Sequence, residues 1–299
     1  MPNYALSDYI QLLVSGLSTG SIYVLIGLGF ITIYNVTGII NLAQGEFVML
    51  GAMLAVAFVG LDLPLGVAAL LSVLGVMLVG LIVYRLTIYP ARGASDVALI
   101  IITIGTSIAI RGLALLLWST TPYSLPEFSP GPPLNLWGAV LGRQRLWIMG
   151  TAAVVLLLLY SLFEFTLLGK AVRACAINRR AAQILGINPQ AMAGLAYALG
   201  SGMSAVAGIV IAPLTLVSYD MGLSLGLKGF VVAIMGGLTN MPAAVIGGLL
   251  LGVLESFSSA FVASGLRDGI SFLVLFVVLL LRTVNLRELR LPSRQRRRA

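Results

Sequence analysis

The chain alternates long apolar runs with short polar connections, and this pattern predicts its secondary structure. Nine apolar runs lie at about 8–33, 44–60, 64–85, 97–118, 146–167, 190–212, 226–240, 243–263 and 268–284. A helix needs about 20 apolar residues to cross a bilayer, and most of these runs are long enough. The second and seventh runs are short, so we expect tilted, broken or re-entrant helices there. The pattern predicts an all-α fold with about eight to ten membrane segments, nine being the best count.

Composition supports this interpretation. Of the 299 residues, 59% are hydrophobic and only 9% are charged, which is typical of a polytopic helical membrane protein and excludes a soluble domain. The runs are continuously apolar instead of alternating, which argues against a membrane β-barrel. We therefore treat residues 1–299 as a single transmembrane domain.

The distribution of basic residues predicts the orientation. Arg85 and Arg92 follow the third run, four basic residues lie between 170 and 180, and the tail over 283–299 is rich in arginine. Positive charge marks cytoplasmic loops, so these three regions share the cytoplasmic side. With nine spans the N-terminus then lies outside and the C-terminus inside. The loop over 119–145 holds five prolines, which predict an extended external cover and not a helix.

Several classes of chemistry are excluded by the residues that the chain lacks. It has no histidine and one cysteine, Cys175, so the usual general base, a thiol metal site and an internal disulfide are all missing. No phosphate-binding loop and no nucleophile elbow occur, which predicts a non-catalytic chain. The net charge of +8 reflects the cytoplasmic loops, so we expect no nucleic-acid partner.

Polar residues at the start of the second run form the first candidate site. Glu46 follows Asn41, Gln44 and Gly45, and a charge inside a membrane segment is a functional hypothesis by default. Two interpretations stay open. Gly45 breaks the helix so that Glu46 faces a ligand, or Glu46 lies at an interface and caps the second run.

Further charges lie in later runs. Arg111 either snorkels outward or pairs with a carboxylate, and Glu255 has Arg111 and Lys228 as candidate partners. A structural ion pair or an interfacial position is the favoured interpretation for these groups. The candidates for the translocation path or its gating are Asn41, Gln44, Gly45, Glu46, Arg111, Lys228 and Glu255.

The second candidate site is a basic segment rich in small residues, 168–190. We expect a short helix from Arg179 to Leu185 closed by Gly186 in the left-handed conformation, and Asn188 as the N-cap of the next span. Small apolar residues give this segment a low face suited to docking a cytoplasmic partner, although a solvated loop that only sets topology stays an alternative. The candidate docking residues are Lys170, Arg173, Ala174, Asn178, Arg179, Ala182, Leu185, Gly186 and Ile187.

Three stretches together resemble a known family. They are GLSTGSIYVLIGLGFITIYNVTGIINLAQGEFVMLGA (16–52), GKAVRACAINRRAAQILGIN (169–188), and GLKGFVVAIMGGL (226–238) followed by AAVIGGLLLGVLE (243–255). In this order they are similar to the LivH-type permease subunits of bacterial ATP-binding-cassette (ABC) importers for branched-chain amino acids. The chain departs from the family pattern at GGLTNMPAA (236–244) and in its C-terminal ending. Close relatives handle urea, short amides and organic acids, and these substrates stay open as alternatives.

The resemblance implies a permease of the bacterial inner membrane that forms the path for a small amino acid. It also implies a second homologous permease, two cytoplasmic ATPases that bind ATP and Mg, an external substrate-binding protein and surrounding lipid. This chain itself then binds no cofactor, and residues 168–190 couple it to an ATPase. Two alternatives of another class stay open: an ion-coupled secondary transporter, and a membrane scaffold without transport.

Overall fold

The computed structural model describes residues 6–136 and 138–261, together with residues 269, 272–274, 276–278 and 280. The predicted basic tail 283–299 lies outside the described residues, as does much of the run 268–284. The elements are, in chain order, α1 (Leu6–Thr37), α2 (Gln44–Val59), α3 (Leu65–Val83), the π-helix η1 (Tyr84–Ile88), α4 (Asp96–Trp118), β1 (Leu134–Leu136), β2 (Ala139–Leu141), α5 (Arg143–Phe165), α6 (Leu167–Ile177), α7 (Arg179–Ile184), α8 (Pro189–Ile211), α9 (Met221–Met235) and α10 (Met241–Phe261).

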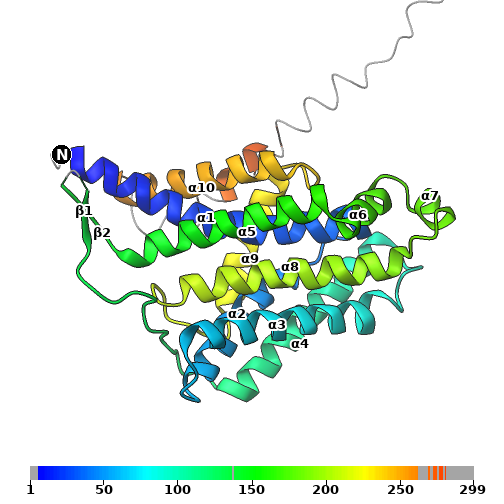
Figure 1. Cartoon of the computed structure of the whole chain (residues 1–299), viewed down its shortest axis with the longest axis horizontal. Coiled ribbons are helices and arrows are strands. Elements are labelled where there is room, and N and C mark those ends of the chain that lie inside the picture. Colours follow the sequence, from blue (N-terminus) through cyan, green and yellow to red (C-terminus); the bar gives the residue numbers. More distant parts are fainter. Residues whose placement is uncertain are drawn as a thin grey trace, which may run out of the picture.

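The predicted all-α membrane architecture is confirmed. Within the described residues six helices are long and apolar enough to cross a membrane: α1, α3 with η1, α4, α5, α8 and α10. The shorter apolar helices are α2 and α9, which are the second and seventh predicted segments. Figure 1 shows the long helices side by side, with the N-terminus and the β1–β2 hairpin at one end and α6 and α7 at the other.

Helix α1 occupies the centre of the bundle. In its most apolar 18-residue window 89% of the residues are buried, against 22% in α4 and in α5. It packs against α5, α8, α9 and α10. Glycines allow its close approach to α10, because a Cβ atom at Gly20 would lie 2.7 Å from the carbonyl oxygen of Gly248. The peripheral helices expose apolar side chains such as Leu78, Ile108 and Leu157, as expected where lipid is the solvent.

Helix α9 crosses the interior between two other helices. Gly222 and Gly226 in its first half lie against Gly45 of α2, and Met235 at its end lies against Gly247 of α10. The apolar pattern placed this helix at 226–240, which is wrong by five residues at each end. The chain turns after Met235, where positive φ angles at 237 and 238 end the helix.

The described residues of the connection between α4 and α5 form no helix. The strands β1 and β2 pair antiparallel, with Leu134 opposite Leu141, and Tyr123 forms a bridge with Val217 in the connection between α8 and α9. Helix α5 begins at Arg143, two residues before the end of the predicted loop 119–145. This connection therefore holds two non-helical segments together at the same end of the bundle as the N-terminus (Figure 1).

Candidate functional site

The first candidate site is the start of α2, where the chain reverses after α1. Gly38 has a φ of 72° and its N–H donates to the Tyr34 carbonyl at 2.7 Å, which ends α1. The Asn41 side chain then accepts from the Ala43 N–H at 3.2 Å, a local turn that leads directly into α2. The prediction that Gly45 breaks a helix is wrong, because α2 begins one residue earlier, at Gln44.

Gly45 is instead a point of close approach. A Cβ atom there would overlap the Gly222 carbonyl oxygen and lie 2.9 Å from the Gly226 Cα atom. Only glycine lets the first turns of α2 and α9 come this close. Two helix N-termini therefore meet beside Glu46 and place partial positive charge next to its side chain.

The Glu46 cluster consists of Glu46, Ser107 and Arg111. The Glu46 side chain is 1% exposed, so its predicted position at an interface is wrong, although it does lie in the first turn of α2. Its Oε1 atom accepts from the Ser107 hydroxyl at 2.7 Å and from Arg111 Nη2 at 2.5 Å. Arg111 therefore pairs with a carboxylate, one of its two predicted alternatives. Ser107 was missed, although it lies four residues before Arg111 on the same face of α4.

Buried polar atoms without a partner gather in this region. Among the described residues Glu46 Oε2, Gln44 Oε1, Asn41 Nδ2 and Arg111 Nε are buried and make no hydrogen bond. Gln44 uses its other polar atom, Nε2, to donate to the Gly200 carbonyl and the Ser204 hydroxyl of α8 at 2.8 Å each. Buried polar groups are nearly always paired, so this concentration of unpaired atoms points to water or a ligand.

A cavity of about 120 Å³ lies against Glu46. Glu46 and Ser107 provide its polar wall, and Gly45, Gly222 and Gly226 provide backbone. The remainder is apolar, from α1, α4 and α9 and the turn before α2. One water occupies about 30 Å³ of liquid, so the cavity has room for a small organic group. Its chemistry suits a hydrogen-bond donor attached to an aliphatic group.

The second polar group inside the bundle is the Lys228 cluster, formed by Tyr23, Lys228 and Glu255. All three residues are buried. Lys228 Nζ lies 3.2 Å from Glu255 Oε1, and the Tyr23 hydroxyl donates to Glu255 Oε2 at 2.7 Å. Glu255 thus pairs with Lys228 and not with Arg111. The cluster ties α9 to α1 and α10, as the favoured structural interpretation predicted.

The candidate coupling segment, residues 168–190, comprises most of α6, all of α7 and the start of α8, and each of these helices has a side-chain cap. Thr166 caps α6 by accepting from Gly169 N–H at 3.0 Å, Asn178 caps α7, and Asn188 caps α8. The predicted α7 helix and the predicted caps at Gly186 and Asn188 are confirmed, Gly186 having a φ of 81°. The Ile187 N–H donates back to the Ala182 carbonyl at 3.0 Å, which closes the helix end.

Most of the predicted docking residues of this segment are exposed, but the two alanines among them are not. Ala182 is buried at 1% exposure and Ala174 is half-buried, so these alanines face the bundle. The exposed aliphatic residues are Ile177, Ile184 and Leu185, at 87%, 86% and 77%. Ile177 and Ile184 were missed because the hydrophobic pattern does not say which side of a short helix packs inward.

The basic side chains of the segment are exposed. Lys170, Arg173 and Arg179 all face outward, and Gly186 lies on the same surface. Arg173 donates to Glu164 at 2.7 Å, a pair whose side chains are 46% and 45% exposed. Such surface pairs contribute about 0–1 kcal/mol, so Arg173 remains available to a partner. Cys175 is buried, which raises the pKa of its thiol.

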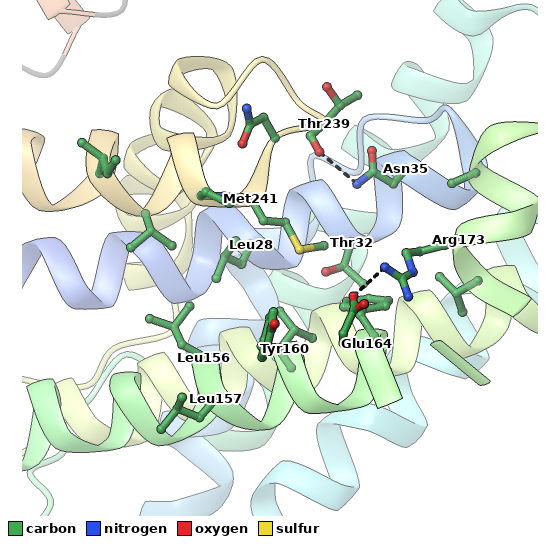
Figure 2. A pocket seen from close by; sticks show the side chains of 18 of the residues that line it. Leu28, Thr32, Asn35, Leu156, Leu157, Tyr160, Glu164, Arg173, Thr239 and Met241 are labelled. Atoms are coloured by element: carbon green, nitrogen blue, oxygen red, sulfur yellow. Dashed lines mark hydrogen bonds and ion pairs between the residues drawn. The ribbon is translucent and has the colours of Figure 1, made fainter. Parts of the chain in front are cut away.

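A larger cavity, about 1030 Å³, lies elsewhere, beside α1, α5, α6 and the start of α10. Figure 2 shows its mainly apolar lining, with the Arg173–Glu164 pair at one side and the Asn35 amide donating to the Thr239 carbonyl. Its charged groups are already paired with each other. The smaller cavity at Glu46 is therefore the stronger site candidate, because among the described residues it alone of these two has a buried carboxylate oxygen without a hydrogen-bond partner.

Comparisons with known proteins identify the family. Residues 12–279 match the family described as branched-chain amino acid transport system / permease component. The chain is 31% identical to the high-affinity branched-chain amino acid transport system permease protein BraD of Pseudomonas aeruginosa, covering 93% of this chain and 95% of that protein. It is 29% identical to the corresponding permease protein LivH of Escherichia coli, covering 91% and 93%.

More distant likenesses also occur. The chain is 26% identical to the ribose import permease protein RbsC of Escherichia coli, over 75% of this chain and 71% of that protein. A chain of the solved PsaBC–Fab complex from Streptococcus pneumoniae aligns with a TM-score of 0.49 and 16% identity, over 92% and 95% of the two chains, which is too weak to support an argument. The family match covers most of the sequence, and the protein is a multi-pass membrane protein that belongs to the branched-chain amino acid transport system permease family.

Proposed function

We propose that this chain is the non-catalytic permease subunit of an ABC importer in the bacterial inner membrane. It forms the translocation path together with a second homologous permease. Two cytoplasmic ATPases bind ATP and Mg, and an external binding protein delivers the substrate. Support comes from the family match, and from relatives named for branched-chain amino acid transport that match over nearly their whole length.

The substrate we propose is a small amino acid of the branched-chain type. The single observation that carries this choice is Glu46, whose Oε2 atom is buried, unpaired and beside an otherwise apolar cavity. A carboxylate oxygen accepts hydrogen bonds from an ammonium group, and the apolar lining suits an aliphatic side chain. An organic acid without an amine places like charges together, and urea and neutral amides lack the charge that strengthens the hydrogen bond.

The residues around the start of α2 then form the path or its gate. Asn41 and Gln44 supply further unpaired polar atoms, and Gly45 keeps α2 and α9 in contact. Arg111 holds Glu46 in place through Oε1 and leaves Oε2 free. The Lys228 cluster acts indirectly, by fixing α9 between α1 and α10.

The coupling segment transmits the movement of an ATPase. Helices α6 and α7 have side-chain caps at their N-termini, and Gly186 ends α7. We therefore expect each helix to move as a rigid unit. Their exposed aliphatic residues and basic side chains fit a groove that is apolar in its centre and acidic at its rim. Closure of the ATPases on ATP would displace this segment and reopen the path.

The first experiment is a gentle detergent pull-down of the tagged chain from native membranes, followed by ATP-driven uptake in proteoliposomes. We expect two ATPases and a second permease in near-equal amounts. We also expect uptake of L-leucine that Glu46→Gln reduces at least about tenfold, the effect of one charge-assisted hydrogen bond. Recovery of the chain alone, with ion-driven uptake, would instead establish a secondary transporter.

Coupling is tested by a double variant, Arg173→Glu with Gly186→Pro. Proline cannot adopt the φ of 81° at position 186, so the α7 end is lost while the membrane helices remain. We expect ATP hydrolysis that no longer drives uptake. The matched control is Arg143→Glu, a charge reversal at the opposite end of the bundle. Normal coupled uptake by the double variant would refute this role.

A further inference from the structure

A third cavity, about 440 Å³ in volume, lies at the end of the bundle that carries α7, and of its lining the function proposed above uses only Arg179. The end of α1, the η1 helix, the start of α4, α7 and the start of α8 enclose it. We call it the arginine cavity, because Arg92 and Arg179 line it and Arg85 lies beside it. Its lining is the most polar of the cavities described so far.

The three arginines lack carboxylate partners. Within the part of the chain that the structure describes, no ion pair within 4 Å involves Arg85, Arg92 or Arg179. The one acidic residue of the lining, Asp96, lies exposed in the first turn of α4 and forms no ion pair among the described residues. With two arginines against one aspartate, the lining of the cavity carries a net positive charge.

Tyr89 organises two of these cations. The guanidinium carbon of Arg85 lies 4.2 Å from the centre of the Tyr89 ring, and that of Arg92 lies 4.4 Å from it. A cation over an aromatic ring at this distance is attracted by the ring. A hydrogen bond from Arg92, together with the charges of both arginines, lowers the pKa of Tyr89. Two cations are thus held against one aromatic ring.

The η1 helix explains why Tyr89 lies at this cavity. Its wide turn is closed by the Tyr89 N–H, which donates to the Tyr84 carbonyl at 2.8 Å, five residues earlier. An α-helix would make this bond four residues earlier, so the π turn shifts every later side chain by about 100° around the axis. Such turns occur frequently at functional sites. Tyr89 follows the π turn directly, and it lines the same cavity as Arg92 and Arg179.

The chemistry favours a phosphate group. A guanidinium presents a planar fork of donors that matches phosphate oxygens, and two arginines from separate elements can hold one phosphate between them. A volume of about 440 Å³ exceeds that of a single ion, since a water takes about 30 Å³. Basic pockets between membrane helices on the cytoplasmic side are typical sites for the headgroups of anionic lipids.

We propose that the arginine cavity binds a phosphate-bearing anion between Arg92 and Arg179, and so ties α7 of the coupling segment to the α3–α4 connection. The phosphate comes from the headgroup of an anionic phospholipid or from a soluble phosphate compound. Because the anion bridges α7 and the bundle, its presence sets how freely the coupling segment moves. The binding site itself is inferred from the three unpaired arginines. Only the effect on the movement of the coupling segment rests on the proposed function.

The test uses the purified full-length chain in neutral detergent, at constant ionic strength. Thermal stability and native mass spectrometry are measured with phosphatidylglycerol, with phosphatidylcholine and with inorganic phosphate. The variants are Arg92→Gln and Arg179→Gln, both on exposed side chains, so the fold is expected to persist. The matched control is Arg180→Gln, the exposed neighbour of Arg179 that does not line the cavity. Because Arg180→Gln keeps the arginine-rich tail, this control also accounts for anion binding by the tail.

We expect each cavity variant to bind the anion about fivefold more weakly than the wild type, and Arg180→Gln to change little. A loss confined to phosphatidylglycerol identifies a lipid headgroup, and a loss that extends to inorganic phosphate identifies a soluble ligand. The proposal is overturned if neither cavity variant weakens binding more than Arg180→Gln does. It is also overturned if the variants weaken only the capture of the ATPases, because the arginines then serve an acidic protein partner.

Discussion

The replacement Arg111→Leu tests the buried ion pair at the start of α2. Glu46 is 1% exposed, and its Oε1 atom is held by Arg111 Nη2 and by the Ser107 hydroxyl. Leucine keeps α4 apolar and helical but removes the cation. The carboxylate then remains buried, with one neutral donor in place of two donors.

The expected cost is large because the carboxylate cannot reach water. Removing one partner of a buried ion pair costs about 3–5 kcal/mol. The chain contains its own comparison, the Arg173–Glu164 pair, whose side chains are 46% and 45% exposed. Breaking an exposed pair costs about 0–1 kcal/mol, so Arg173→Leu is a matched arginine-to-leucine control. The difference between the two variants measures the effect of burial.

The assay is reversible unfolding in mixed detergent micelles, followed by circular dichroism. We expect Arg111→Leu to lower the free energy of unfolding by about 3–5 kcal/mol. Adding Glu46→Gln to it should restore about 1–3 kcal/mol, because the stranded charge is then gone. The reasoning is refuted if Arg111→Leu costs no more than Arg173→Leu, or if the double variant is no more stable than the single one.

Three further predictions concern single residues. Gly45→Ala should lower the melting temperature strongly, because its Cβ would overlap the Gly222 carbonyl oxygen. Gly105→Ala, which has open space around it, should leave the melting temperature unchanged or raise it. Equal effects of the two variants would contradict the close approach of α2 and α9. Cys175 should react slowly with a maleimide at pH 7 and faster as the pH rises past 9, since burial raises the pKa of its thiol; fast labelling at pH 7 would contradict this packing. Gly186→Ala should lower the free energy of unfolding by about 1–3 kcal/mol and increase hydrogen exchange in α7, because the φ of residue 186 is 81°. Unchanged exchange would show that the helix end tolerates a side chain.

The helices and caps followed from the sequence wherever the controlling interactions are local. The predicted helix α7, its glycine end and the Asn188 cap involve side chains and backbone groups only two to five residues apart. The first six apolar runs also correspond to helices with small boundary shifts. These features require no knowledge of the rest of the bundle.

Features that depend on packing were predicted less well. The ends of α9 were misplaced because Gly222 and Gly226 start this helix against α2, a contact that hydrophobicity along the chain does not record. The side of α7 that faces the bundle was predicted incorrectly for a similar reason. Ala182 faces the bundle while Ile177 and Ile184 face outward, and apolarity alone cannot distinguish a core position from an exposed interface.

The sequence by itself determined that this is an all-α membrane protein, that its charged residues inside the apolar runs need partners, and that histidine, thiol-metal and nucleotide-loop chemistry are excluded. Only the tertiary structure decided the partners. Glu46 pairs with a cation 65 residues away and Glu255 with one 27 residues away. Burying a charge is costly unless an opposite charge lies nearby, but only the packing of the helices decides which opposite charge is within reach.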